Sequence, residues 1–199
     1  HYGTDVYVRV PWNDFVTIKK TLDAGATGIH VPYVNTREEA ELAVRACKYP
    51  KDGVPGIRGI AGSPRAVGYG LNTANYLQKA NDEILVYVAL ETPQAIDNLD
   101  EIMKVDGVDG IFIGPMDLST SMGYFASPMH PEVQKKIAEV EKKVLGSGKF
   151  LGTVAGSFER AQELYDRGYQ YLLTLSDTTT LSSVCRSFVT KFQEAYPEK

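Results

Sequence analysis

The sequence of 199 residues predicts an α/β fold of the (β/α)-barrel type, with six of the eight βα units of a closed barrel in this chain. Two observations predict it. Six β-rich runs alternate with helical patterns, which is typical of parallel strands joined by helices. These runs are also nearly continuous in apolar residues, as expected of parallel strands that are buried on both faces. We therefore expect one domain over residues 1–199, large enough to bury a core.

A unit of the same design occurs three times along the chain. Each time a helical stretch ends in an acidic residue and a glycine, and a β-rich run follows at once, after residues 23–25, 105–107 and 166–168. Glycine just after a helix adopts the left-handed conformation that ends the helix. A short loop then leads into the strand.

Adding the remaining apolar runs gives six predicted strands, at residues 6–10, 29–34, 84–91, 110–114, 150–155 and 169–175. Helical patterns separate them, near residues 13–23, 36–47, 93–104, 130–147, 158–167 and 178–194. The helix at 93–104 has typical start residues, because Thr92 can cap it and Pro93 suits its first position.

Two features leave the architecture open on the pattern alone. Six units are two fewer than a closed barrel contains, and the chain opens almost directly on a strand. A doubly wound open sheet therefore remains an alternative. Residues 51–81 form a long excursion with glycines and arginines, but no linker or low-complexity stretch divides the series into two domains.

Composition and charge argue against several classes of function. A net charge of -4 provides no basic field for nucleic acid. The apolar runs are too short to span a bilayer, and no charged-then-apolar leader stands at the start, so we expect a cytoplasmic protein that does not enter membranes. Cys47 and Cys185 are far apart and outside metal-binding spacing, so we expect two buried thiols.

Two acidic residues follow consecutive predicted strands. Glu91 closes the strand at 84–91, and Asp117 comes after the strand at 110–114. Active sites of such barrels lie at the carboxyl ends of the strands, and consecutive parallel strands are usually neighbours. Both carboxylates should therefore project from one rim, where they would suit Mg²⁺ or Mn²⁺. In the alternative interpretation, Glu91 pairs with an arginine and Asp117 caps a turn at Leu118.

Arg9 lies within the first predicted strand, among apolar neighbours. A guanidinium there is costly unless an anion meets it, and a substrate carboxylate would do so through a bidentate contact. Glu91 or Asp117 is the alternative partner, and either would still keep Arg9 in the site. The adjacent backbone N–H groups of Met116 and Asp117 could hold a carboxylate beside the metal.

Several segments carry a family resemblance, and they cover nearly the whole chain. Among them are Arg9-Val-Pro, Val31-Pro-Tyr-Val-Asn35, Arg45-Ala-Cys-Lys-Tyr-Pro50, Tyr76-Leu-Gln-Lys-Ala-Asn-Asp82 and His130-Pro-Glu-Val133. The most specific is the run Phe-Ile-Gly-Pro-Met-Asp-Leu at 112–118, with Glu91 standing 26 residues before Asp117. In these segments the sequence resembles the HpcH/HpaI aldolase family.

The resemblance implies a (β/α)₈ barrel that cleaves 4-hydroxy-2-oxo acids reversibly to pyruvate and an aldehyde. It also implies a divalent metal, Mg²⁺ or Mn²⁺ with Co²⁺ or Zn²⁺ as alternatives. By position, Glu91 and Asp117 resemble the family's metal ligands, and Arg9 resembles its catalytic arginine, which binds the substrate carbonyl and the enolate. The amides of Met116 and Asp117 fall where the family holds the pyruvate carboxylate.

The resemblance further implies a homo-oligomer, a hexamer whose last helix packs on a neighbouring subunit. An apolar stripe in the predicted last helix is compatible with that role: Leu181, Val184, Phe188, Val189 and Phe192. A core face packed within the chain would explain the same stripe equally well.

One departure from the family concerns the acid–base step. The family has two further βα units before the part that this sequence matches, with a histidine after the second strand, so we expect an N-terminally incomplete domain. Of the three histidines here, His1 is terminal, His30 lies mid-strand as a core residue, and His130 is a surface or capping residue. We expect weak aldol turnover, with oxaloacetate decarboxylation surviving better.

Three other hypotheses compete with a metal-dependent aldolase. A Schiff-base mechanism would need a lysine at the carboxyl end of a strand, and Lys149 instead precedes its strand. A carbon–carbon lyase acting on an acyl-CoA would need a basic groove, to which Arg58 and Arg65 could contribute. They could equally meet a distal carboxylate or phosphate of the substrate, or lie in solvent. A non-catalytic, truncated subunit stabilised by assembly is the third hypothesis, because an open barrel edge must be paired or covered.

Overall fold

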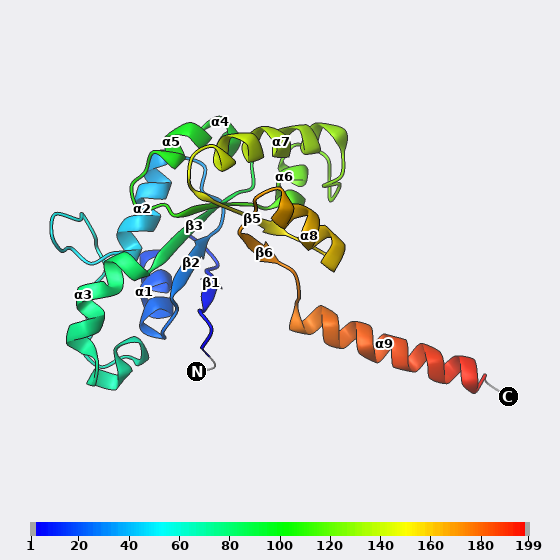
Figure 1. Cartoon of the computed structure of the whole chain (residues 1–199), viewed down its shortest axis with the longest axis horizontal. Helices are drawn as coiled ribbons and strands as arrows, with labels where there is room; N and C mark the ends of the chain where they lie inside the picture. The colour runs from blue at the N-terminus through cyan, green and yellow to red at the C-terminus, as the bar shows by residue number, and fades with distance from the viewer. Residues whose placement is uncertain (1–2, 198–199) are drawn as a thin grey trace.

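The computed structural model describes residues 3–197, so His1 lies outside the described part of the chain. Six parallel strands form one sheet in the order β1-β2-β3-β4-β5-β6, each paired with the next in sequence. The sheet curls into a half-barrel with helices packed around its outer face (Figure 1). Sequential strand order excludes the doubly wound alternative, in which the order reverses at a switch point. The predicted α/β class and the six βα units are confirmed.

The strands are β1 (Tyr7–Arg9), β2 (Gly28–Val31), β3 (Leu85–Leu90), β4 (Gly110–Ile113), β5 (Phe150–Val154) and β6 (Tyr171–Leu173). The helices on the way to β4 are α1 (Phe15–Asp23), α2 (Arg37–Cys47), the 3-10 turn η1 (Arg65–Gly70), α3 (Thr73–Glu83), α4 (Pro93–Asp97) and α5 (Leu99–Met103). Those after β4 are α6 (Pro115–Ser121), α7 (Pro131–Leu145), α8 (Phe158–Asp166) and α9 (Asp177–Ala195).

Every predicted strand is present, with ends that agree with the prediction within three residues, but the helices differ in two ways. The single helix expected at 93–104 is wrong, because it divides at Asn98 into α4 and α5. The Asn98 side chain donates a hydrogen bond to the carbonyl of Asn35 at 2.8 Å, which holds the break against the loop after β2. Two short helices, α3 and α6, were not predicted.

The inner face of the sheet carries aromatic rings. Tyr7, Tyr87 and Tyr171 meet there, with ring centroids 4.8 to 5.9 Å apart. Gly28 and Gly110 lie opposite two of these rings in the strand register, and a Cβ on either glycine would lie 2.3 Å from a ring carbon. Glycine at these positions therefore makes room for the tyrosines.

His30 belongs to the same inner face. It is 1% exposed and its ring centroid lies 4.5 Å from that of Phe112. Neither ring nitrogen has a hydrogen-bond partner among residues 3–197. Burial, aided by the charge of Arg9, lowers the pKa of His30 to about 4. The expectation of a packed core histidine is confirmed.

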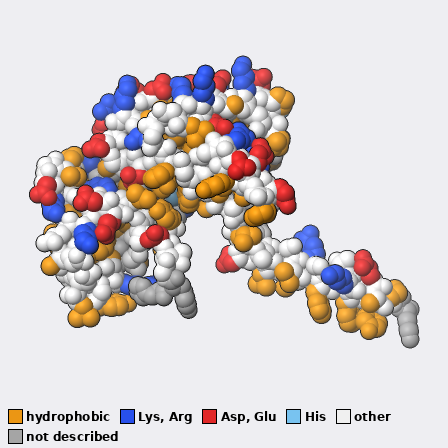
Figure 2. All heavy atoms as spheres, in the orientation of Figure 1, with side chains coloured by type: hydrophobic (Ala, Val, Ile, Leu, Met, Phe, Trp, Pro, Cys, Tyr) orange, Lys and Arg blue, Asp and Glu red, His pale blue; other side chains and the backbone are white. Residues whose placement is uncertain are grey.

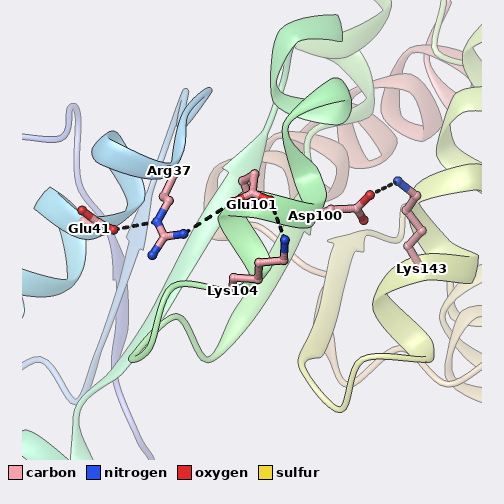
Figure 3. Close-up of polar contacts among 6 residues, drawn as sticks. All are labelled: Arg37, Glu41, Asp100, Glu101, Lys104 and Lys143. Carbon is pink, nitrogen blue, oxygen red and sulfur yellow. Dashed lines mark hydrogen bonds and ion pairs between the residues drawn. The ribbon is translucent and has the colours of Figure 1, made fainter.

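Charged residues cover the solvent side of the helices that pack on the outer face. Figure 3 shows a chain of ion pairs that joins α2, α5 and α7 through Arg37, Glu41, Asp100, Glu101, Lys104 and Lys143. The interhelical pairs measure 3.4 Å between Arg37 and Glu101 and 2.8 Å between Asp100 and Lys143. Pairs as exposed as these contribute little to stability. These ion pairs therefore belong to an ordinary solvated surface of the helices.

The last helix, α9, departs from the rest of the molecule. It extends away from the half-barrel (Figure 1), and none of its residues is buried. Figure 2 shows hydrophobic side chains gathered along its lower edge. The core-face interpretation of this stripe is therefore wrong within this chain.

The expectation of two buried thiols holds for only one of them. Cys47 is buried, and burial raises its pKa to about 12, but Cys185 lies exposed on α9.

No helix among residues 3–197 is long and apolar enough to cross a membrane.

Candidate active site

Glu91 follows β3 directly and is 5% exposed. Its Oε2 accepts a hydrogen bond of 2.9 Å from the backbone N–H of Tyr33, the second residue after β2. Burial raises the pKa of Glu91, and the negative charge of Asp117 raises it further, while the Tyr33 hydrogen bond and the charge of Arg9 act in the opposite direction. Glu91 is thus a buried carboxylate with a second carboxylate and a guanidinium nearby.

Asp117 stands in the first turn of α6, which begins at Pro115 after β4. Its side chain is exposed and does not cap the helix, whose N-cap is Gly114. The turn-capping alternative for Asp117 is therefore wrong. The first N–H groups of a helix have no partner within it, so the amides of Met116 and Asp117 remain available to an anion.

Gly114 makes room for Glu91 between β4 and α6. A Cβ added at Gly114 would lie 2.8 Å from Cγ of Glu91 and 2.9 Å from its Oε1. The backbone of Gly114 has φ of -96° and ψ of 88°, so no left-handed conformation requires the glycine. The close approach of the Glu91 side chain is the reason that a larger residue does not fit.

Arg9 is the last residue of β1 and is exposed. The sequence-based argument that burial forces an anion onto it is therefore wrong. Among the described residues it forms no ion pair with Glu91 or Asp117, which removes the alternative partners named from the sequence. Its charge nevertheless lowers the pKa of Glu91 and of His30.

The candidate site thus combines Arg9 at the end of β1, Glu91 directly after β3 and Asp117 in the first turn after β4. Between residues 3 and 197, no group of three or more His, Cys, Asp or Glu side chains is close enough to hold a metal ion. Glu91 and Asp117 follow the paired strands β3 and β4, and the negative charge of Asp117 contributes to the raised pKa of Glu91. A divalent cation would relieve the repulsion between the two carboxylates. Mg²⁺ is often held by one or two carboxylates plus water and substrate, so this donor set fits it.

Arg58 and Lys149 clarify two of the competing hypotheses. Arg58 is buried and pairs with Asp23 at 3.1 Å, so it neither lines a groove for a nucleotide nor lies in solvent. Lys149 precedes β5 and donates a hydrogen bond of 2.6 Å to the carbonyl of Val108, before β4. As predicted, it therefore lies at the end of the sheet opposite the site.

Two residues of this rim were not predicted from the sequence. Tyr33 provides the hydrogen bond to Glu91, and Trp12 stacks on the Tyr33 ring, with centroids 6.1 Å apart and planes at 30°. A signal was present, because both are aromatic residues directly after a proline that follows a strand. Because proline has no N–H to donate to a neighbouring strand, it ends the strand, and the residue after it then lies at the rim.

Known proteins resemble this chain over most of its length. The family model described as HpcH/HpaI aldolase/citrate lyase matches residues 1–183. A hydroxypyruvate/pyruvate aldolase of Sagittula stellata is 46% identical over 184 residues, or 90% of this chain and 70% of that protein. A 4-hydroxy-2-oxo-heptane-1,7-dioate aldolase of Escherichia coli is 39% identical over 191 residues, or 96% of this chain and 72% of that protein.

Solved structures agree with the sequence matches. The structure of an HpcH/HpaI aldolase from Desulfitobacterium hafniense superposes with a TM-score of 0.85 at 31% identity, over 96% of this chain and 73% of that one. An HpcH/HpaI aldolase/citrate lyase family protein from Burkholderia cenocepacia gives 0.87 at 32% identity, over 94% and 73%.

Proposed function

Because the chain belongs to the HpcH/HpaI aldolase/citrate lyase family, we propose that it is a metal-dependent aldolase that cleaves a 4-hydroxy-2-oxo acid to pyruvate and an aldehyde. The observation that carries the proposal is that Glu91 and Asp117 follow the neighbouring strands β3 and β4 at one end of the sheet, where the charges of Asp117 and Arg9 both act on Glu91. Relatives at 39% and 46% identity are named aldolases, which supports the same reaction class.

Glu91 and Asp117 would hold the divalent cation, Mg²⁺ or Mn²⁺, with Co²⁺ or Zn²⁺ as alternatives. When bound, such an ion supplies a Lewis acid that stabilises negative charge on substrate oxygens. Its affinity depends on both carboxylates being ionised, and the raised pKa of Glu91 shows that ionisation is penalised without a cation. A bound cation would offset this penalty on the ionised form of Glu91.

The chain's own groups would orient the 2-oxo acid. The amides of Met116 and Asp117, at the start of α6, would bind the carboxylate of the substrate. Arg9 would donate hydrogen bonds to the C2 oxygen. As the C3–C4 bond breaks, its electron pair forms the C2=C3 double bond, and the π pair of the C2 carbonyl moves onto its oxygen. The positive charge of Arg9 then stabilises this pyruvate enolate. Subsequent protonation at C3 yields pyruvate.

The proton of the C4 hydroxyl needs an acceptor, and Arg9 cannot serve because it remains protonated. Among residues 3–197, no hydrogen bond connects His30 or His130 with Glu91 or Asp117; His130 caps α7 instead. Acid–base help is typically worth about 10² to 10⁴ in rate. Oxaloacetate decarboxylation needs no such acceptor, so we expect this chain to decarboxylate oxaloacetate faster than it cleaves an aldol.

A coupled assay tests the proposal. Pyruvate released from 4-hydroxy-2-oxopentanoate and from oxaloacetate is followed with lactate dehydrogenase, with Mn²⁺ and after treatment with EDTA. We expect both activities to require the metal and to fall at least about tenfold in Glu91→Gln, the effect of losing about 1.4 kcal/mol of stabilisation. Glu83→Gln, at the exposed end of α3, is the matched control. Metal-independent rates, or equal rates in Glu91→Gln, would contradict the proposal.

The assembly proposal concerns α9. Its apolar side chains Leu181, Val184, Phe188 and Phe192 are 58 to 73% exposed, which is unusual for large hydrophobic residues in one row. We propose that this row packs on a second copy of the chain in a homo-oligomer, with a hexamer as the expected state. Light scattering should give an oligomer that Phe188→Glu dissociates and Lys191→Glu, on the same helix, does not. A monomeric parent chain would refute it.

A further inference from the structure

Asn35 lies in the loop after β2 and forms hydrogen bonds through both its backbone and its side chain. Its backbone N–H donates to Oε2 of Glu39 at 2.6 Å, and its carbonyl accepts from Nδ2 of Asn98 at 2.8 Å. Its side-chain Nδ2 donates to the carbonyl of Tyr33 at 2.9 Å, and its Oδ1 accepts from the hydroxyl of Thr92. The backbone of Asn35 is thus fixed to α2 and to the break between α4 and α5, and its side chain connects two loops.

The two loops that Asn35 connects are the ones that hold Glu91. Thr92 is the residue directly after Glu91 in the chain. Tyr33 donates its backbone N–H to Oε2 of Glu91 at 2.9 Å. Together with the peptide bond between Glu91 and Thr92, these hydrogen bonds close a ring that passes through Asn35. The ring joins the loop after β2 to the loop after β3.

This ring engages one oxygen of Glu91 and leaves the other outside it. Oε2 accepts the hydrogen bond of Tyr33, whereas Oε1 lies on the side of Gly114, 2.9 Å from the position that a Cβ of that residue would take. Gly114 is the N-cap of α6, whose first turn carries Asp117. Oε1 is therefore the oxygen of Glu91 that lies beside the start of α6.

The ring needs an acceptor and a donor on one short side chain, and asparagine has both. The amide oxygen of Asn35 accepts the proton of the Thr92 hydroxyl, and its NH₂ group donates to a backbone carbonyl. That carbonyl belongs to Tyr33, whose φ of 53° lies in the left-handed region and is costly for a bulky residue. The hydrogen bond from Asn35 therefore helps to hold a backbone conformation that the loop would not otherwise favour.

We propose that Asn35 is a positioning residue of the metal site, which holds the N–H of Tyr33 against Oε2 of Glu91 and so leaves Oε1 for the cation. The proposal rests on the metal-dependent function proposed above and deepens it. Groups that hydrogen-bond to metal ligands fix the orientation of those ligands, and their replacement typically costs about 10- to 100-fold in metal affinity or activity. Asn35 acts through Tyr33 and Glu91 and does not itself contact the cation.

Binding of Mn²⁺ to the full chain, followed by electron paramagnetic resonance of the free ion, measures this role without any turnover. We expect Asn35→Ala to weaken Mn²⁺ binding about 10- to 100-fold. Asn72→Ala is the matched control, because Asn72 is exposed and its side chain does not cap α3. Thr92→Val removes the hydroxyl and keeps the shape of the side chain, so it should also weaken binding, whereas Thr92→Ser should bind as the parent does.

A second pair of variants separates the ring from helix capping. Oγ1 of Thr92 also accepts a hydrogen bond of 3.1 Å from the N–H of Ala95, so Thr92→Val removes the cap of α4 as well. Ser157→Ala removes the corresponding cap of α8 and should leave the Mn²⁺ affinity unchanged. In the double variant Asn35→Ala/Thr92→Val, the loss of affinity should equal that of Asn35→Ala alone, because both changes break one ring. Losses that add in full would contradict the ring.

Trp12 is the single tryptophan of the chain and reports on the loop without any metal. Its ring stacks on that of Tyr33, with centroids 6.1 Å apart. The fluorescence emission of Trp12 in Asn35→Ala should therefore move towards its emission in Tyr33→Leu. Emission equal to that of the parent would show that Asn35 does not hold the loop, and would overturn the proposal.

The outcomes distinguish the positioning role from the proposed function. If the parent chain does not bind Mn²⁺, the proposed function fails, and Asn35 has no metal ligand to position. If the parent chain binds Mn²⁺ and a folded Asn35→Ala or Thr92→Val chain binds it as tightly, the proposed function stands and the positioning role of Asn35 is wrong.

Discussion

Replacing Gly114 by alanine should damage the metal site without removing any of its ligands. The added Cβ would lie 2.8 Å from Cγ of Glu91, a distance that side-chain carbons do not tolerate. Glu91 is buried, so its carboxylate must rotate away or the backbone must shift. The backbone of Gly114 itself accepts alanine without strain, because its φ is -96°. The change therefore acts on Glu91 alone.

The expected magnitude follows from the cost of overpacking. Forcing one extra carbon into a filled space costs about 1 to 3 kcal/mol. If that cost falls on the conformation that binds the cation, Mn²⁺-dependent oxalate affinity drops roughly 5- to 150-fold. Calorimetric titration of oxalate in the presence of Mn²⁺ measures this drop. Gly156→Ala is the control, because no atom lies within 4 Å of its added Cβ. A folded Gly114→Ala chain that binds oxalate as tightly as the parent would refute the reasoning.

Three further predictions concern stability, each measured by urea unfolding. The folded pKa of His30, about 4, lies below its ordinary value of 6.5, so the free energy of unfolding decreases as the pH falls from 6.5 towards 4. Between pH 7.5 and pH 5 we expect a loss of about 2 kcal/mol, which should be absent in His30→Leu. Arg58→Ala leaves Asp23 without one of its two cations, and we expect a loss of about 3 kcal/mol; a loss below about 1 kcal/mol would contradict a structural ion pair. Thr36→Ala removes the capping box of α2 and should cost about 1 kcal/mol, whereas an unchanged midpoint would show the cap to be dispensable.

The fold could be predicted largely from the sequence because its strands are short apolar runs, three of which follow a helix that ends in a glycine. Their order in the sheet is their order in the chain, so local patterns were sufficient. The break at Asn98 could not be predicted in this way, because it depends on a hydrogen bond to Asn35, 63 residues earlier. The helix α3 buries only Ala80, so its apolar pattern was too weak to detect.

The same distinction applies to the site. The placement of Glu91 and Asp117 at one end of the sheet could be predicted because each follows its own strand and the two strands are neighbours; their role as metal ligands stays a prediction. For Tyr33 the sequence offered only a weak signal, its place after a proline, since its role depends on a left-handed backbone and on a contact with Glu91 after the neighbouring strand. Arg58 was misinterpreted because its partner Asp23 stands 35 residues before it and buries what appears, in the sequence, to be a free cation.

The central claim is that Glu91 and Asp117 together hold a divalent cation that recruits a 2-oxo acid. Titration of oxalate into the full chain by calorimetry, with and without Mn²⁺ or Mg²⁺, tests it most directly, alongside Glu91→Gln and Asp117→Asn. The account predicts binding that requires the metal and is lost in both variants, while Glu83→Gln binds as the parent does. Metal-independent binding, or binding that survives in either variant, would contradict it.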